Sequence, residues 1–172
     1  MLTLERVTKT YKVGTFGGKD FTAVRDVSFQ VQPGEVVSLI GESGSGKSTI
    51  GKMILRLSPV TEGSIAFDGL DVSQLKRGQV KGYYRRVQGV FQDPFSSYNP
   101  IFKADRVFEL LRTEYFRDLH RAEWQRKVAA AVERVALDPA QVLGKYPHEL
   151  SGGQRQRLLV ARALLLDIRL LV

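Results

Sequence analysis

The sequence predicts an α/β domain that begins with antiparallel strands and carries a helical section inserted after about residue 100. Three observations predict this: strand-type patterns up to residue 31, a strand–glycine loop–helix unit over residues 36–57, and apolar residues at helical spacing from residue 107 onward. The 172 residues, of which 43% are hydrophobic, can bury a core and amount to about one domain at roughly 150 residues per domain.

The strands are expected first. Residues 2–7 and 24–31 show strand-type patterns, and Pro33-Gly34 ends the second of them, which suggests an antiparallel start. Residues 36–40, Val-Val-Ser-Leu-Ile, form a nearly continuous apolar run. Such a run is typical of a strand buried on both faces of a parallel sheet, so we expect this segment inside the core.

The later elements are predicted from spacing. Apolar residues at helical intervals predict a helix over residues 50–57, and residues 63–67 and 87–91 are expected as short strands. Further helices are expected from residue 107, over residues 124–135 and over residues 154–166, and residues 170–172 begin another strand.

Composition excludes several classes of protein. No apolar run approaches the roughly 18 residues of a membrane-spanning helix, and the absence of cysteine excludes disulfide frameworks, Cys-based zinc sites and thiol catalysis. The start of the chain lacks the apolar region of a secretory signal, so a cytosolic location is expected. The net charge of +8 suits phosphate-bearing ligands, nucleic acid or an anionic membrane surface without choosing among them.

Residues 41–49, Gly-Glu-Ser-Gly-Ser-Gly-Lys-Ser-Thr, match the pattern GxxxxGK[ST] between a predicted strand and a predicted helix. Glycines let the backbone approach phosphates closely, and the helix N-terminus favours negative charge. Lys47 can reach the β- and γ-phosphates, and the Ser48 hydroxyl can bind Mg²⁺. We expect nucleotide binding by Gly41, Glu42, Ser43, Gly44, Ser45, Gly46, Lys47, Ser48 and Thr49.

Residues 150–154, Leu-Ser-Gly-Gly-Gln, stand directly before a predicted helix. Ser151 is well placed as its N-cap, and a Ser-Gly-Gly step at a helix start favours a bound anion. Taken alone, these residues would more often be an ordinary helix cap.

Together these motifs resemble the ATP-binding cassette (ABC) ATPases, whose signature LSGGQ is usually continued as RQR, as it is here. The resemblance covers nearly the whole chain, from the phosphate loop through FQDPFSSYNP at residues 91–100 to PHELSGGQRQR at residues 147–157. The stretch at residues 91–100 is close to the form found in the peptide and nickel (oligopeptide/dipeptide) importer branch. The resemblance implies a P-loop NTPase fold.

The resemblance also implies roles for single residues. Tyr11 resembles the aromatic residue that stacks on adenine, although a core or strand-edge tyrosine is the alternative. Gln92 resembles the accessory glutamine that completes the Mg²⁺ and water shell, although a solvated turn residue is the alternative. Residues Ser151, Gly152, Gly153 and Gln154 resemble the signature that meets the ATP of a partner subunit. His148 is interpreted as structural, and not as the family's switch histidine.

In the family, a strand after the signature helix ends in an aspartate that holds Mg²⁺ and a glutamate that polarises the attacking water. Neither acid stands in this sequence, because Asp167 is followed by Ile168 and precedes the strand start at Leu170. The resemblance therefore implies an N-terminal part of the family's domain, for which we expect weak ATP binding, no turnover without the missing acids, poor solubility and low stability.

The function implied is that of the ATPase subunit of a transporter for peptides or a related small solute, with ATP and Mg²⁺ as cofactors. Its expected partners are a second ABC ATPase subunit, transmembrane permease subunits and, indirectly, an extracytoplasmic solute-binding protein, at the cytoplasmic side of the inner membrane. The alternatives are a soluble ABC-type ATPase acting on nucleic acid or the ribosome, and a binding module without turnover. Scattered basic residues without interleaved aromatics speak against nucleic acid. The expected division is a β subdomain and phosphate-loop core over residues 1–98, a helical subdomain over 99–160, and a return to the core over 161–172.

Overall fold

The computed structural model describes residues 1–14, 18–91 and 98–172. They form two compact units, Met1–Tyr84 with Val172 and Arg85–Leu171, which are described one after the other. Gln92 lies outside the described residues. The functional division of the chain expected from the sequence stays a prediction.

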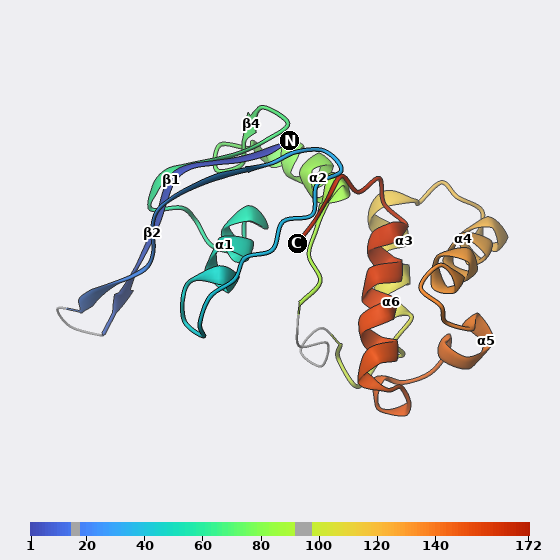
Figure 1. Cartoon of the computed structure of the whole chain (residues 1–172). Coiled ribbons are helices and arrows are strands. Elements are labelled where there is room, and N and C mark those ends of the chain that lie inside the picture. The colour runs from blue at the N-terminus through green and yellow to red at the C-terminus, as the bar shows by residue number, and fades with distance from the viewer. Residues whose placement is uncertain (15–17, 92–97) are drawn as a thin grey trace. The chain divides into compact units, whose positions relative to one another are not determined.

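The first unit is built on an antiparallel sheet of four strands in the order β2-β1-β3-β4 (Figure 1). The strands are β1 (Leu2–Val13), β2 (Lys19–Val31), β3 (Glu62–Phe67) and β4 (Leu70–Asp71). Leu2 and Leu4 are buried on one face of β1, as alternation along a strand requires. Val7 is buried as well, because a register shift between Leu4 and Val7 interrupts the alternation. The predicted antiparallel start is confirmed. Both strands are longer than their apolar residues indicated, because β1 ends at Val13 instead of residue 7 and β2 begins at Lys19 instead of residue 24.

Helix α1 (Lys47–Ile54) comes directly after the glycine loop and buries Ile50, Met53 and Ile54. The helix ends earlier than predicted, because Leu55 is its C-cap and Arg56 takes the left-handed backbone conformation at φ 55°. The chain then leads through residues 57–61 into β3.

The predicted buried strand over residues 36–40 is wrong in this structure. The segment is neither helix nor strand, and Val36 and Ile40 are each 93% exposed. A central parallel strand is stabilised by hydrogen bonds to neighbours on both edges. No strand in the described part of the chain pairs with residues 36–40.

Helix α2 (Arg77–Arg86) was not predicted, because it contains two glycines and Tyr83 is its only buried residue. Contacts of two tyrosines, and not a stripe of apolar side chains, hold α2 against the rest of the unit. The hydroxyl of Tyr83 donates to the carbonyl of Ile54, the hydroxyl of Tyr84 donates to that of Leu55, and the Tyr83 ring meets Phe67 edge to face.

The second unit is mainly helical (Figure 1). Its elements are β5 (Val87–Gln88), α3 (Arg106–Tyr115), α4 (Arg121–Glu133), α5 (Pro139–Val142), the 3-10 helix η1 (Pro147–Glu149), α6 (Gly152–Leu164) and β6 (Leu170–Leu171). The three longer helices confirm those predicted from spacing. The predicted strand over residues 87–91 is only two residues long, and it pairs in parallel with β6.

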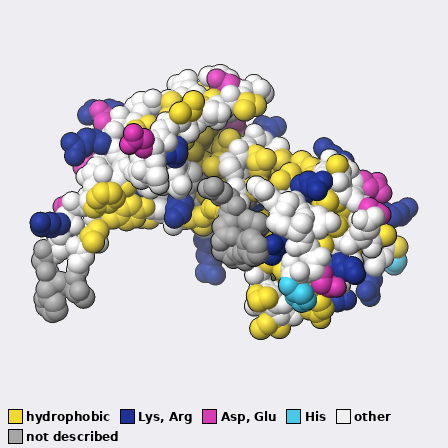
Figure 2. All heavy atoms as spheres, turned by 60° about the horizontal axis from the view of Figure 1, so that its bottom comes forward, with side chains coloured by type: hydrophobic (Ala, Val, Ile, Leu, Met, Phe, Trp, Pro, Cys, Tyr) yellow, Lys and Arg dark blue, Asp and Glu magenta, His cyan; other side chains and the backbone are white. Residues whose placement is uncertain are grey.

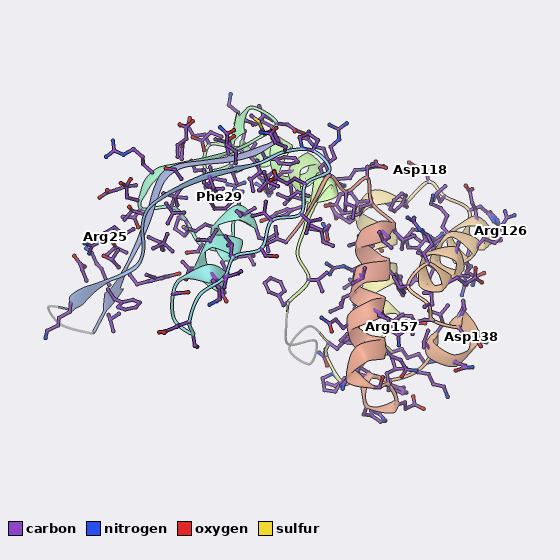
Figure 3. All side chains as sticks on the ribbon, viewed as in Figure 1. Arg25, Phe29, Asp118, Arg126, Asp138 and Arg157 are labelled. Carbon is purple, nitrogen blue, oxygen red and sulfur yellow. The ribbon has the colours of Figure 1, made fainter. Side chains whose placement is uncertain are left out.

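Trp124, Phe108 and Leu158 lie at the centre of this unit's core and are almost fully buried. Two of the side chains labelled in Figure 3, Asp138 and Arg157, form hydrogen bonds that hold the connections around this core. Asp138 caps α5 by accepting from the amide of Ala140 at 2.9 Å. Arg157 on α6 donates to the carbonyl of Ala136 at 2.9 Å, which holds α6 to the loop after α4. Within the described ranges, no helix combines the length and the apolar character that crossing a bilayer requires.

Candidate nucleotide-binding site

The phosphate loop leads into α1 with two glycines in the left-handed backbone conformation, Gly44 at φ 85° and Gly46 at φ 90°. Gly46 is also tightly enclosed, because a Cβ atom added there would lie 2.4 Å from the carbonyl oxygen of Ala23 and 2.9 Å from the Val24 side chain. The loop end is therefore pressed against β2, and a side chain at residue 46 does not fit.

The N-terminus of α1 is open to an anion. Gly46 is its N-cap and contributes no side-chain hydrogen bond, and the first helical bond runs from the amide of Ile50 to the carbonyl of Gly46 at 3.0 Å. The amides of Lys47, Ser48 and Thr49 thus precede the first intrahelical bond. Together with the helix dipole, such amides favour negative charge at this position.

Lys47 forms hydrogen bonds with three other residues of the phosphate loop. Its ammonium donates to the carbonyls of Gly41 at 2.7 Å and Glu42 at 2.6 Å, and to the hydroxyl of Ser45 at 3.2 Å. All three donors of the ammonium are used in this way. The cation therefore stands among the residues that the motif assigns to phosphate binding.

Tyr11, near the end of β1, lies beside α1 and the segment after it. Its hydroxyl is 3.5 Å from the Ser58 hydroxyl, and the Lys9 ammonium lies 4.9 Å from its ring centroid. The hydrogen bond with Ser58 is the largest effect that lowers the pKa of Tyr11; burial opposes it, and a hydrogen bond with Thr49 and the charges of Lys9 and Lys52 add to the lowering. These contacts bring Tyr11 together with Thr49 of the phosphate loop.

The residues predicted to bind a metal ion are only partly described. Ser48 lies in the first turn of α1 with an exposed side chain, and Gln92 lies outside the described residues. Across the described residues, no three His, Cys, Asp or Glu side chains gather into a site that could hold a metal. A single hydroxyl fits Mg²⁺ that keeps its waters and shares phosphate oxygens, which is how this ion is usually bound.

The signature residues lie in the second unit, at the start of α6. The Ser151 hydroxyl accepts from the amide of Gln154 at 3.2 Å, and the Gln154 side chain accepts from the amide of Ser151 at 2.8 Å. This reciprocal capping box confirms Ser151 as the N-cap. A Cβ atom at Gly152 or Gly153 would meet nothing within 4 Å, so nothing in the described residues crowds these two positions.

Two other residues singled out in the sequence have structural contacts. Asp167 forms an ion pair with Arg85 at 2.9 Å. The ring of His148, in η1, stacks on that of Tyr146 with centroids 5.7 Å apart. Sequence reasoning missed Lys9 and Ser58 as neighbours of Tyr11. The spacing of Lys9 and Tyr11, two residues apart on one strand, could have indicated that they share a face.

The family model of the ABC transporter matches residues 24–172. A probable peptide ABC transporter ATP-binding protein of Sinorhizobium fredii is 39% identical over 176 residues, covering 100% of this chain and 49% of that protein. A putative peptide import ATP-binding protein of Brucella ovis is 45% identical over 143 residues, covering 83% of this chain and 44% of that protein. The glutathione import ATP-binding protein GsiA of Escherichia coli O157:H7 is 43% identical over 155 residues, covering 90% of this chain and 24% of that protein. The chain thus spans about half the length of the first two relatives, and less of the third.

Among solved structures, the dimeric ATP-binding cassette MJ0796 in a post-hydrolysis state with ADP and Pi has a TM-score of 0.82 at 32% identity. The match covers 95% of this chain and 69% of that one. CbiO1 from Clostridium perfringens, at 23% identity and a TM-score of 0.77 over 99% of this chain and 63% of that one, shares the fold. The expected α/β fold of an ABC ATPase is confirmed. On the family match and these relatives together, the chain belongs to the ABC transporter family.

Proposed function

We propose that this chain is the ATP-binding part of an importer subunit that couples ATP binding and hydrolysis to the uptake of peptides or a related small solute. The observation that carries the proposal is the start of α1, where open amides, two left-handed glycines and the Lys47 ammonium share one loop. The peptide and glutathione import named for its relatives supports the solute class.

In this proposal the amides of residues 44–49 receive the phosphates, and Lys47 exchanges part of its bonding within the loop for β- and γ-phosphate oxygens. Ser48 would hold Mg²⁺, which supplies positive charge to the phosphates, and Gln92 is proposed to complete its shell. Tyr11 stacks on the adenine ring from the side of β1. Phosphoryl transfer depends mainly on such positioning and charge stabilisation.

The signature is proposed to act in an assembly. Ser151, Gly152, Gly153 and Gln154 would face the ATP held by a second ABC ATPase subunit, since the neighbour MJ0796 is described as a dimer. Transmembrane permease subunits, and through them an extracytoplasmic solute-binding protein, complete the proposed system at the cytoplasmic side of the inner membrane.

A nucleic-acid partner is not proposed. On the face shown in Figure 2, lysine and arginine side chains are spread among acidic, polar and hydrophobic ones instead of forming a continuous basic surface. Binding along a nucleic-acid backbone depends on such a continuous surface.

The proposal is tested by titrating the intact protein with ATP in a calorimeter, with and without Mg²⁺. We expect Mg²⁺-dependent binding that Lys47→Ala lowers at least tenfold, because the ammonium's charge-assisted bonds to phosphate are lost. Lys76→Ala is the matched control, since it removes an equal charge from an exposed position of the same unit. If the unchanged protein gives no Mg²⁺-dependent heat with ATP, the proposed function is wrong.

A further inference from the structure

Lys9 is a buried lysine on β1, with only 7% of its surface exposed. Buried ammonium groups are costly unless a partner stabilises the charge. In the part of the chain that the structure describes, no carboxylate forms an ion pair with Lys9; its ammonium instead lies over the ring of Tyr11, 4.9 Å from the centroid. A cation at this distance from an aromatic face is attracted by the ring's quadrupole.

The backbone sets this pair beside the phosphate loop. Lys9 is opposite Val24 in the β1–β2 ladder, and register shifts occur on both sides of Lys9. Val24 is also one of the residues against which Gly46 is pressed. Lys9 is therefore paired with the part of β2 that supports the end of the loop.

The ring of Tyr11 is held at two places. The Lys9 ammonium occupies one face, and the Ser58 hydroxyl lies 3.5 Å from the phenol oxygen. The charge of Lys9 also contributes to the lowered pKa of Tyr11, although less than the hydrogen bond with Ser58 does. With Lys9 over one face and Ser58 at the hydroxyl, a base that stacks on this ring would use the opposite face.

We propose that Lys9 is a positioning residue for base binding: its ammonium holds one face of the Tyr11 ring, so that the other face receives the purine of ATP. This inference rests on the proposed function, because it assumes that Tyr11 stacks on adenine. Lys9 acts through Tyr11 and does not contact the nucleotide. Removing its charge should weaken binding of the base while leaving binding of the phosphate chain unchanged.

The test compares Lys9→Met with Lys9→Arg in the intact protein, using ATP and inorganic tripolyphosphate as the two ligands in the presence of Mg²⁺. Methionine fills a similar volume without charge, and arginine keeps a cation over the ring. We expect Lys9→Met to weaken ATP binding roughly three- to tenfold, and to change tripolyphosphate binding less than twofold. Lys9→Arg should restore ATP binding to within about twofold of the original protein.

Two further measurements separate positioning from a general structural role. In a Tyr11→Leu background, Lys9→Met should have no additional effect on ATP affinity, because its effect runs through the ring. In an ultraviolet titration, with Tyr11→Phe identifying the signal of this phenol, Lys9→Met should raise the pKa of Tyr11. Lys12→Met, an exposed lysine on the same strand, is the control that should leave all values unchanged.

The outcomes are distinguishable. If Lys9→Met weakened ATP and tripolyphosphate binding equally, Lys9 would act on phosphate binding or on the stability of the fold. If ATP affinity were unchanged or increased, the cation would not position the Tyr11 ring for the base. Either result overturns the inference. Either result leaves the proposed function standing, which fails only if the unchanged protein does not bind ATP.

Discussion

At the scale of single residues, Gly44 and Gly46 show how two glycines of one motif can be needed for different reasons. Both have the left-handed backbone conformation that side chains disfavour. A Cβ atom at Gly44 would meet nothing within 4 Å, whereas one at Gly46 would collide with the backbone of Ala23. Within the folded chain, Gly44 is needed for its backbone conformation, and Gly46 for its conformation and for the space beside Ala23.

The pair gives a prediction for stability. Gly44→Ala should lower the free energy of unfolding by about 1–2 kcal/mol, the cost of a left-handed conformation for a side-chain-bearing residue. Gly46→Ala should lower it by a further ~1–3 kcal/mol, because β2 must shift to admit the methyl group. Urea unfolding followed by circular dichroism measures both changes, and equal losses for the two variants would contradict the role assigned to Ala23.

At the residue scale, the sequence predicted those features that depend on the spacing of residues within a motif. The run of residues 41–49 predicted the loop at the start of α1, and Ser151 was predicted as the N-cap that it is. It did not predict the environment of Tyr11. The contact with Ser58 joins residues 47 positions apart in sequence, which no local pattern encodes.

At the scale of elements, α6 begins with two glycines that its own geometry does not require. Neither has a positive φ, and neither is crowded. Glycine within a helix costs roughly 0.5–1 kcal/mol relative to alanine. Residues that weaken their own helix without a packing reason are expected where another molecule approaches the backbone closely, which supports the role proposed for the signature.

Replacing either glycine of the signature is expected to increase stability and to decrease ATP hydrolysis. Gly152→Ala and Gly153→Ala should each raise the free energy of unfolding by about 0.5–1 kcal/mol. In the intact protein, each should leave ATP binding unchanged but lower ATP hydrolysis at least tenfold, because the methyl group obstructs the partner's nucleotide. Gly78→Ala in α2, also uncrowded, is the control that should stabilise without loss of hydrolysis. Full hydrolysis by both signature variants would argue against the proposed contact.

Elements were predictable where an apolar stripe fixes them. Helices α3, α4 and α6 each have apolar residues at helical spacing, which lie on one face of the helix. These faces are buried against one another in a single core. Helix α2 has no such stripe and depends on tyrosine hydroxyls, so its residues show no periodic pattern. Residues 36–40 have strand composition, but composition alone does not supply the neighbouring strands that a sheet needs.

At the scale of the whole molecule, the exposed segment 36–40 dominates the expected behaviour in solution. Val36 and Ile40 are almost fully exposed, and Val37 and Leu39 are each 42% exposed. An unpaired apolar segment of this kind offers both hydrophobic surface and free backbone groups to another chain. The 172-residue chain by itself should therefore associate with itself.

We predict that this chain elutes in size-exclusion chromatography as species that grow with concentration, and that it binds a fluorescent hydrophobic dye. Replacing Val36 and Ile40 together with threonine should reduce both effects, because threonine keeps strand propensity while lowering apolar surface. Val13→Thr, which alters a single exposed valine at the end of β1, should change neither. A monomer that unfolds reversibly in one sharp transition would contradict this expectation.

The bonds that Lys47 makes within its loop have a consequence for how a nucleotide is admitted. When a phosphate oxygen takes over one of the ammonium's donors, a carbonyl of Gly41 or Glu42 loses its partner. Both residues are exposed, so water can at once replace the lost bond at little cost. Lys47 can thus hold the loop together and still exchange these bonds for phosphate oxygens without leaving a buried oxygen unsatisfied.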